Sequence, residues 1–458
     1  MNSDVFLHMQ HCDPGFFFGD DAVQRSHRRF RYSDWMNLPT PTDQHEVRVN
    51  DREQLIYLLT EAAEIEHGLM CTYLYAGWSL KQSTDEGVTP AQLEAIDRWR
   101  KEIRSVAMEE MAHLATVNNL LMSIGSPPHF RRQNFPVAAG YHPASLVVRL
   151  APLTRDTLAH FIYLERPEGV EMAQAPGFET AVTYQRRPWA SRLTPTAEDF
   201  DTVGHLYRGI GQGFETLAAR LGESALFVGH PEAQLGPDIM TLPGLVTVTD
   251  LNSAREAVDV IVEQGEGGRH DSEESHYARF ITMAEEYDAF LRDDPQFTPH
   301  RSVAADPLMF APIGDAPGVQ VTAHDSARVL DLANATYGLM LRLLASGTGT
   351  PQSVAARRRE IDGAVGLMHV LNDLSVLLTT LPAGGEPRPH AGMNFHLPRS
   401  GLALPQVEAG AALLAERAHE IALALDVLGE SVPGLDAKLA QQLRDLAAAL
   451  PTPATDDQ

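Results

Sequence analysis

Cysteine and basic residues are both scarce in this 458-residue sequence, and each shortage excludes a class of protein. The two cysteines, Cys12 and Cys71, lie far apart, which excludes a disulfide framework and a clustered thiolate site for zinc or iron–sulfur. They fit a reducing, cytoplasmic setting. The 36 basic residues are outnumbered by 61 acidic ones, and the resulting net charge of −25 opposes binding to nucleic acid or to an anionic membrane.

Long hydrophobic runs are also missing. No run reaches the roughly 18 apolar residues of a membrane span, and the first twenty residues lack a basic segment followed by a long apolar one. We therefore expect a protein that is neither secreted nor embedded in a membrane. Hydrophobic residues still make up 44% of the chain and charged residues 21%, which is typical of a soluble globular protein and leaves enough apolar material for a core.

What the sequence does contain is helical periodicity, which predicts an all-α fold. Apolar residues recur at spacings of three, four and seven in four stretches, and the last of these is interrupted by the glycine-rich, charged segment GEGGRHDSEES. The stretches are residues 51–80, 90–124, 197–221 and 251–291. Four such segments predict a four-helix bundle within residues 51–295.

The remaining parts of the chain are expected to elaborate this bundle. Residues 127–196 hold many prolines and two β-prone pieces, ASLVVRL and HFIYLE, and should form a long irregular insertion. Residues 1–50 have no clear period and are expected to be an irregular N-terminal arm. Residues 296–458 should form a C-terminal helical extension packed on the bundle, with helical regions at about 324–381 and 407–450.

Three polar residues occupy positions where the helical pattern calls for apolar ones. Glu66 lies in the apolar stripe of the first helix, and Glu110 and His113 interrupt the stripe of the second. Burying an unpaired ion costs several kcal/mol, so acids on apolar faces need compensation. Residues three apart on a helix project side by side, and a Glu facing a Glu-x-x-His pair is half of the arrangement that carboxylate bundles use for two metals.

The second half of such a site should come from the later helices. His276 heads the apolar stripe of the last segment and is the expected imidazole ligand. Its carboxylate companion is expected to be Glu263 or Glu266, at the end of the preceding segment. Glu273 forms a literal Glu-x-x-His pair with His276 but lies in the charged break, and Glu215 ranks below these candidates.

Simpler interpretations compete with each of these assignments. A single Glu-x-x-His pair often lies on an exposed helix, and the position on an apolar face argues against that for Glu110 and His113. A second pair, Glu64 and His67, should be partly exposed or should support the ligands from outside. The histidine-containing stretch PRPHAGMNFHL, residues 387–397, is expected to be an ordered surface loop.

Several strings together resemble a known family. The strings EIEHGLMCTYLYA, RSVAMEEMAHLATVNNLLMSIGSPPHF, IVEQGEG and SHYARF are similar to the ferritin-like domain of the iminophenyl-pyruvate dimer synthase family, to which chromopyrrolic acid synthases are related. The resemblance covers about residues 50–290. It implies metal ligation by Glu66, Glu110 and His113, and a role for residues 263–267 and His276. Many relatives have Pro-Pro where this chain has Cys71-Thr72, which indicates a different branch.

Ligands and resemblance together predict an iron-dependent oxidoreductase with two iron ions, or manganese in their place, and dioxygen or peroxide as co-substrate. The expected reaction is oxidation or oxygenation of a small, aromatic amino-acid-derived metabolite in specialised metabolism, such as oxidative coupling of imines. The alternatives are metal storage, a structural metal site, and peroxide dismutation by two manganese ions. We expect a small-molecule substrate and neither nucleic acid nor membrane as a partner, and the sequence leaves a homo-oligomer open.

Overall fold

The computed structural model describes the chain from residue 47 to residue 450, with gaps. The described residues are 47–138, 140–142, 146–179, 194–195, 197–265, 274–311, 317–349, 352–384, 389–399, 401–402 and 407–450. Contacts between Cα atoms divide the chain into Met1–Gln44 and His45–Gln458, and every described residue belongs to the second unit. The expected N-terminal arm, residues 1–50, therefore lies outside the described residues as far as residue 46.

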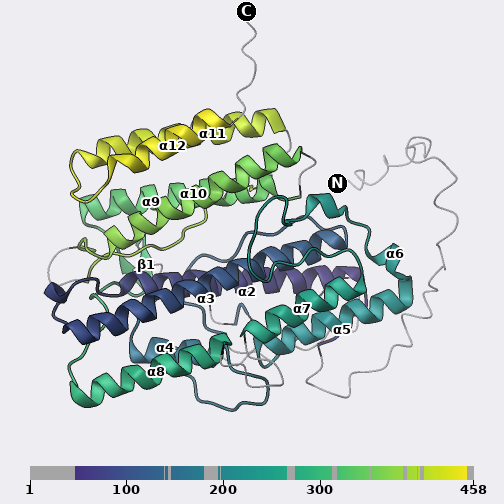
Figure 1. The fold of residues 1–458 in the computed structure, drawn as a ribbon, viewed down its shortest axis with the longest axis horizontal. Helices are drawn as coiled ribbons and strands as arrows, with labels where there is room; N and C mark the ends of the chain where they lie inside the picture. The colour runs from purple at the N-terminus through teal and green to yellow at the C-terminus, as the bar shows by residue number, and fades with distance from the viewer. Residues whose placement is uncertain are drawn as a thin grey trace, which may run out of the picture. The chain divides into compact units, whose positions relative to one another are not determined.

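The first two helices of the expected bundle are present with nearly the expected bounds. Helix α2 (Arg52–Ser79) begins at Asp51, whose carboxylate accepts a hydrogen bond of 2.8 Å from the backbone of Gln54. Helix α3 (Pro90–Ser123) begins after Thr89, which forms a reciprocal capping box with Gln92. The connection, which includes the 3₁₀ turn η1 (Thr84–Glu86), is short, so the two helices pack together as antiparallel neighbours (Figure 1).

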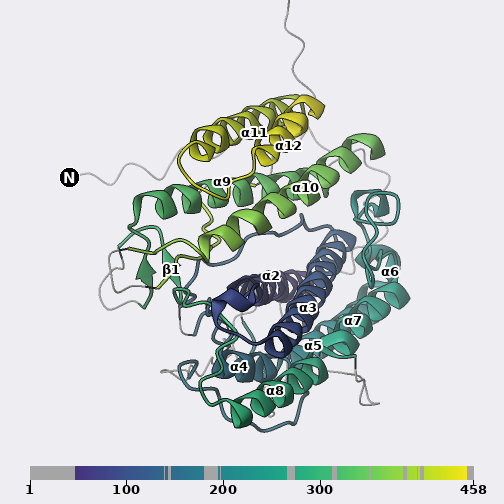
Figure 2. The same cartoon turned by 60° about the vertical axis from the view of Figure 1, so that its left-hand side comes forward.

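Further helices surround this pair. Helix α5 (Val203–Leu221) packs against α7 (Leu251–Gly265) and α2, while α8 (His276–Asp293) packs against α4 (Arg155–Leu164) and α3 (Figure 2). The short elements α6 (Glu223–Leu226) and η2 (Pro231–Ala233) lie between α5 and α7 in the chain. The expected last helix of the bundle is thus two helices, α7 and α8, and the prediction of an all-α fold is confirmed.

Helix α4 corrects the interpretation of one piece of the insertion. The string HFIYLE was expected to be β-prone, but its residues 160–164 are helical. Thr154 caps the helix by accepting from the backbone of Thr157, and Leu158, Phe161 and Ile162 are buried. Among the described residues, the strands are only β1 (Pro307–Leu308) and β2 (Val319–Gln320), which pair in parallel.

The two expected C-terminal regions are each a pair of helices. Helix α9 (His324–Gly347) packs against α10 (Val354–Leu378) and α11 (Val407–Gly429), and α12 (Ala437–Ala449) packs against α11 and α10. Helix α10 also contacts α2. We retain the division into a bundle, residues 51–295, and an extension, residues 296–458, as a proposal.

Helix α10 is long and apolar enough, by length and composition alone, to cross a membrane, and 44% of its most apolar window is buried. It packs against α9, α12 and α2, and core helices of soluble proteins meet the same criteria of length and composition. One such helix is weak evidence for a membrane span.

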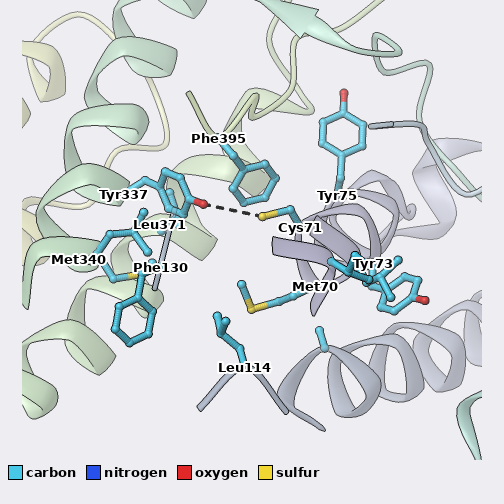
Figure 3. Close-up of a cluster of buried hydrophobic side chains, with 14 of the residues drawn as sticks. Met70, Cys71, Tyr73, Tyr75, Leu114, Phe130, Tyr337, Met340, Leu371 and Phe395 are labelled. Carbon is cyan, nitrogen blue, oxygen red and sulfur yellow. Dashed lines mark hydrogen bonds between the residues drawn. The ribbon is translucent and has the colours of Figure 1, made fainter. Parts of the chain in front are cut away.

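Helix α2 is buried on more than one face, and Figure 3 shows Cys71 and Tyr73 projecting from it in different directions. On one face Cys71 points toward Tyr337 of α9, with 3.9 Å between Sγ and the phenol oxygen (Figure 3). The same phenol lies 2.6 Å from Nε2 of the buried His67 and accepts a hydrogen bond of 3.1 Å from Arg132. Tyr73 points away from this face, toward the interior of the bundle.

Candidate metal centre

Two groups of buried carboxylate and imidazole side chains meet inside the bundle. One consists of Glu66, Glu110 and His113, and the other of Glu110, Glu165 and His276. Within each group, one ligand atom from every residue lies within 4.8 Å of the others. Glu110 belongs to both groups, so the two form one continuous cluster of three carboxylates and two imidazoles.

Helices α2 and α3 build the first group. Nδ1 of His113 lies 3.2 Å from Oε2 of Glu110 and 3.5 Å from Oε2 of Glu66. The three side chains are 2–3% exposed. The side-by-side projection of residues three apart therefore brings Glu110 and His113 together, and the packing of α2 on α3 supplies Glu66.

The second group joins α3 to the ends of two shorter helices. His276 is the first residue of α8, and Glu165 directly follows α4. Nδ1 of His276 lies 3.0 Å from Oε1 of Glu110 and 3.7 Å from Oε2 of Glu165. Glu110 thus presents one oxygen to each imidazole, so its carboxylate lies between the two groups.

A second layer of hydrogen bonds holds four of these five side chains from outside. The phenol of Tyr207 in α5 donates to Glu66, and the phenol of Tyr73 in α2 donates to Glu165. The two imidazoles use their outer nitrogens. Nε2 of His113 lies 2.8 Å from the amide oxygen of Gln264, and Nε2 of His276 lies 2.9 Å from Oε2 of Glu109. Each Nδ1 is thereby left to face the centre of the cluster.

The electrostatics of the cluster reflect crowded negative charge in a dry site. Burial raises the pKa of Glu66, and the neighbouring carboxylate of Glu110 raises it further. Burial alone would lower the pKa of His113, but hydrogen bonds to Glu110 and Glu66 raise it to about 10. The pKa of His276 is also raised, against burial, by Glu110 and Glu109. In the absence of a cation, protons on these groups would have to balance the buried carboxylates.

The residues fit a pair of metal ions. Nδ1 of His276 is fully buried and, despite its nearby carboxylates, makes no hydrogen bond of acceptable geometry. A buried polar atom of this kind needs a partner, and a cation would supply one. Three carboxylates and two imidazoles are the donor set that suits iron or manganese.

Three of the other candidate residues lie apart from the cluster in the structure. Glu263 is exposed on α7, because the helical phase turns its neighbour Gln264 toward His113 instead. Glu215 forms a half-exposed ion pair of 2.8 Å with Arg255. Glu64 bonds His129 and Tyr141, away from both groups. Glu266 and Glu273 lie outside the described residues.

The residues that the sequence analysis missed are Glu165, Glu109 and Gln264. Glu165 lies four positions after Phe161 and seven after Leu158, so it continues the apolar stripe of α4. The test that singled out Glu66, an acid on an apolar helical face, would have found it. The helix was missed because the aromatic and β-branched residues in HFIYLE favour strands. Neither His390 nor His396, from the histidine-containing stretch, belongs to either group.

A narrow cleft opens beside the first group. Its volume is about 20 Å³, which is room for roughly one water molecule. The ends of α4, α5 and α7 supply its apolar wall, with Leu164, Val203 and Ile261. Arg166 also lines it, 8% exposed, and its guanidinium stacks on Tyr163 and donates to two backbone carbonyls.

Residues 59–285, which contain the whole cluster, match the family model described as ferritin-like. The chain carries a ferritin-like domain. A solved ferritin-like protein from Caulobacter vibrioides aligns with 71% of this chain and 96% of that chain, at 19% identity and a TM-score of 0.39, a score too low to support equivalence of individual elements.

Two curated proteins are similar to most of the chain. Dichlorochromopyrrolate synthase from Lentzea aerocolonigenes is 29% identical over 411 residues, covering 82% of this chain and 39% of that protein. 2-Imino-3-(indol-3-yl)propanoate dimerase from Chromobacterium violaceum is 27% identical over 374 residues, covering 76% of this chain and 34% of that protein. Both are named as enzymes, and the resemblance to the chromopyrrolic acid synthases is confirmed. The chain spans between a third and two fifths of their length.

Proposed function

We propose that this chain is a non-haem, di-iron oxidase or oxygenase that acts on a small, aromatic amino-acid-derived metabolite, as in the oxidative coupling of imines. The observation that carries the proposal is the convergence of three buried carboxylates and two imidazole Nδ1 atoms on one point of the bundle. The names of the two relatives support the substrate class, because one denotes an indole-bearing imino acid and the other a chlorinated chromopyrrolate. A reducing, cytoplasmic setting is part of the proposal, since Cys71 is a free, buried thiol.

The five ligands and their outer partners have distinct roles in this proposal. Glu66 with His113, and Glu165 with His276, would each hold one iron ion, and Glu110 would bridge them. Bound iron would supply the redox chemistry with dioxygen or peroxide. Tyr207 and Tyr73 fix the orientation of the carboxylates, and the apolar wall of the cleft limits the access of water.

The cleft supports a division between the two co-substrates. Its volume of about 20 Å³ leaves room for a small oxidant at most and none for an indole ring. The organic substrate would therefore bind at or beyond the mouth of the cleft. Arg166 is the cation among the residues that line the cleft, and it offers a partner for the carboxylate of an amino-acid-derived substrate.

The proposal is tested by measuring consumption of dioxygen and of peroxide by the iron-loaded protein with 2-imino-3-(indol-3-yl)propanoate and with related aromatic imines. We expect consumption that depends on both iron and the imine. Full iron occupancy without any consumption would contradict the proposal. Oxygen evolution from peroxide by the manganese-loaded protein would indicate peroxide dismutation, and uptake of iron far beyond two ions per chain would indicate storage.

A further inference from the structure

The inner ligands of the two groups are nearly equivalent. Each group contains one carboxylate of its own, one oxygen of the shared Glu110, and one imidazole that faces the centre through Nδ1. Even the tyrosines correspond, because Tyr207 donates to Glu66 and Tyr73 donates to Glu165. Any difference between the two positions must therefore come mainly from outside this shell.

The partners of the outer imidazole nitrogens are different. His113 meets Gln264, a neutral amide, at 2.8 Å. His276 meets Glu109, a carboxylate, at 2.9 Å. Glu109 also pairs with the cation Arg279, with 2.8 Å between Oε2 and Nη1, and this pairing favours the carboxylate form. One imidazole is thus backed by a full negative charge and the other by a dipole.

Arg279 fixes the orientation of the Glu109 carboxylate beside His276. Its Nη1 lies 2.9 Å from Oε1 and 2.8 Å from Oε2 of Glu109, and its side chain is 13% exposed. Glu109 is therefore held in place on the side away from the cluster, with one oxygen directed at the imidazole. Gln264 stands near the end of α7 and has no comparable ion holding its amide oxygen among the described residues.

Outer partners tune the strength of a metal ligand. A carboxylate that accepts the outer N–H of an imidazole fixes its tautomer and makes the inner nitrogen a stronger donor, and loss of such a partner typically weakens metal binding about 10–100-fold. An amide oxygen fixes the tautomer as well but contributes no charge.

We propose that the two metal positions are inequivalent, that the position formed by Glu110, Glu165 and His276 binds a divalent cation more tightly and fills first, and that Glu109 is the positioning residue responsible. This inference rests on the proposed two-metal site. Glu109 contacts His276 from outside and does not reach the centre of the cluster. The inference is that this outer contact sets the order in which the two positions bind metal.

Cobalt(II) is a suitable probe, because its visible absorption reports occupancy without any catalytic turnover. The variant His113→Ala retains the ligands of one position and His276→Ala those of the other. We expect His113→Ala to bind one cobalt ion at least about 10-fold more tightly than His276→Ala. Equal affinities would overturn the inference and leave the metal centre intact, whereas no cobalt binding by either variant or by the wild type would overturn both.

Charge exchange at the outer positions separates tuning from damage to the fold. In the His113→Ala background, Glu109→Gln should weaken cobalt binding about 10-fold or more. In the His276→Ala background, Gln264→Glu should tighten binding at the other position, a gain that a purely structural role would not produce. Unchanged affinity in both exchanges, or equal weakening at both positions by Glu109→Gln, would contradict the role assigned to Glu109.

Discussion

At the scale of single residues, the main feature of the cluster is buried negative charge that needs compensation. Three carboxylates share a site in which Glu66 and Glu110 are each 2% exposed. Among the described residues, the cationic groups in direct contact with their inner oxygens are imidazoles, which carry a charge only when protonated. Two divalent cations would neutralise the carboxylates and leave each imidazole neutral, which is the form that binds metal. The same side chains thus suit metal ions better than protons.

Another buried histidine allows a test of burial alone. His160 in α4 lies 2.7 Å from the backbone oxygen of Val147 and stacks on Phe178 with 4.1 Å between ring centroids. Burial lowers its pKa to about 4. The unfolded chain, with a histidine pKa near 6.5, binds the proton first, so this group stabilises the fold above about pH 6.5 and loses that contribution as pH falls toward 4.

His160→Gln keeps a donor for Val147 but cannot titrate. We therefore expect the difference in the free energy of unfolding between wild type and His160→Gln to shrink by roughly 2.5 kcal/mol between pH 7.5 and 4.5. Urea unfolding of both proteins at several pH values, with chelator present to remove metals, measures the difference. A deficit that stays constant over this range would show that His160 does not have a lowered pKa.

How far the site could be predicted depends on whether each helix was recognised. Glu66, Glu110, His113 and His276 follow from acids or imidazoles on apolar stripes, and the structure brings these four together. Glu165 escaped because α4 consists of residues that also favour strands. Gln264 was missed because its acidic neighbour Glu263 was the stronger candidate for a metal ligand. Where a helix ends is uncertain from sequence, so the direction of each side chain there is uncertain as well.

At the scale of elements, the long helices were predictable and their close contacts were not. The bounds of α2 and α3 follow from caps and periodicity, whereas the contact of residues 47–49 with α5 depends on Gly209, which faces Val47, and Gly213, which faces Val49. A Cβ atom at Gly213 would lie 2.6 Å from Cγ2 of Val49, closer than side-chain atoms approach. A Cβ at Gly211 would meet Val258 at an ordinary 3.5 Å.

These distances predict opposite effects of one methyl group on a single helix. Gly213→Ala should lower the free energy of unfolding by about 1–3 kcal/mol, because the segment containing Val49 must move. Gly211→Ala should be neutral or stabilising by up to about 1 kcal/mol, since alanine favours the helix. Chemical denaturation of the two variants measures both changes. A stabilising Gly213→Ala would show that the segment does not occupy this groove.

At the scale of the whole described unit, the C-terminal helices are joined to the bundle through buried polar groups. Tyr337 of α9 takes a hydrogen bond from Arg132, which is 7% exposed, and lies 2.6 Å from the fully buried His67 of α2. The sequence around Arg132 has no helical periodicity, so nothing in it indicates that this side chain is buried. The position of α9 beside α2 could therefore not be predicted.

Removing this phenol should affect stability but not metal binding. Tyr337→Phe leaves Arg132 and His67 without their shared partner and should lower the free energy of unfolding by about 1–3 kcal/mol. Metal content should be unchanged, because Glu66 and Tyr73, which belong to the cluster and its outer hydrogen bonds, project from another face of α2. Loss of metal in Tyr337→Phe would show that the two faces are coupled.

Elemental analysis of purified protein tests the metal centre most directly, in wild type beside Glu110→Ala, Glu165→Ala and the exposed-site control Glu263→Ala. Because Glu110 belongs to both groups, the account predicts two metal ions per chain in wild type and in Glu263→Ala, about one in Glu165→Ala, and almost none in Glu110→Ala. The helical circular dichroism signal should be retained throughout. A Glu110→Ala protein that keeps both metal ions and its helical signal would contradict the account.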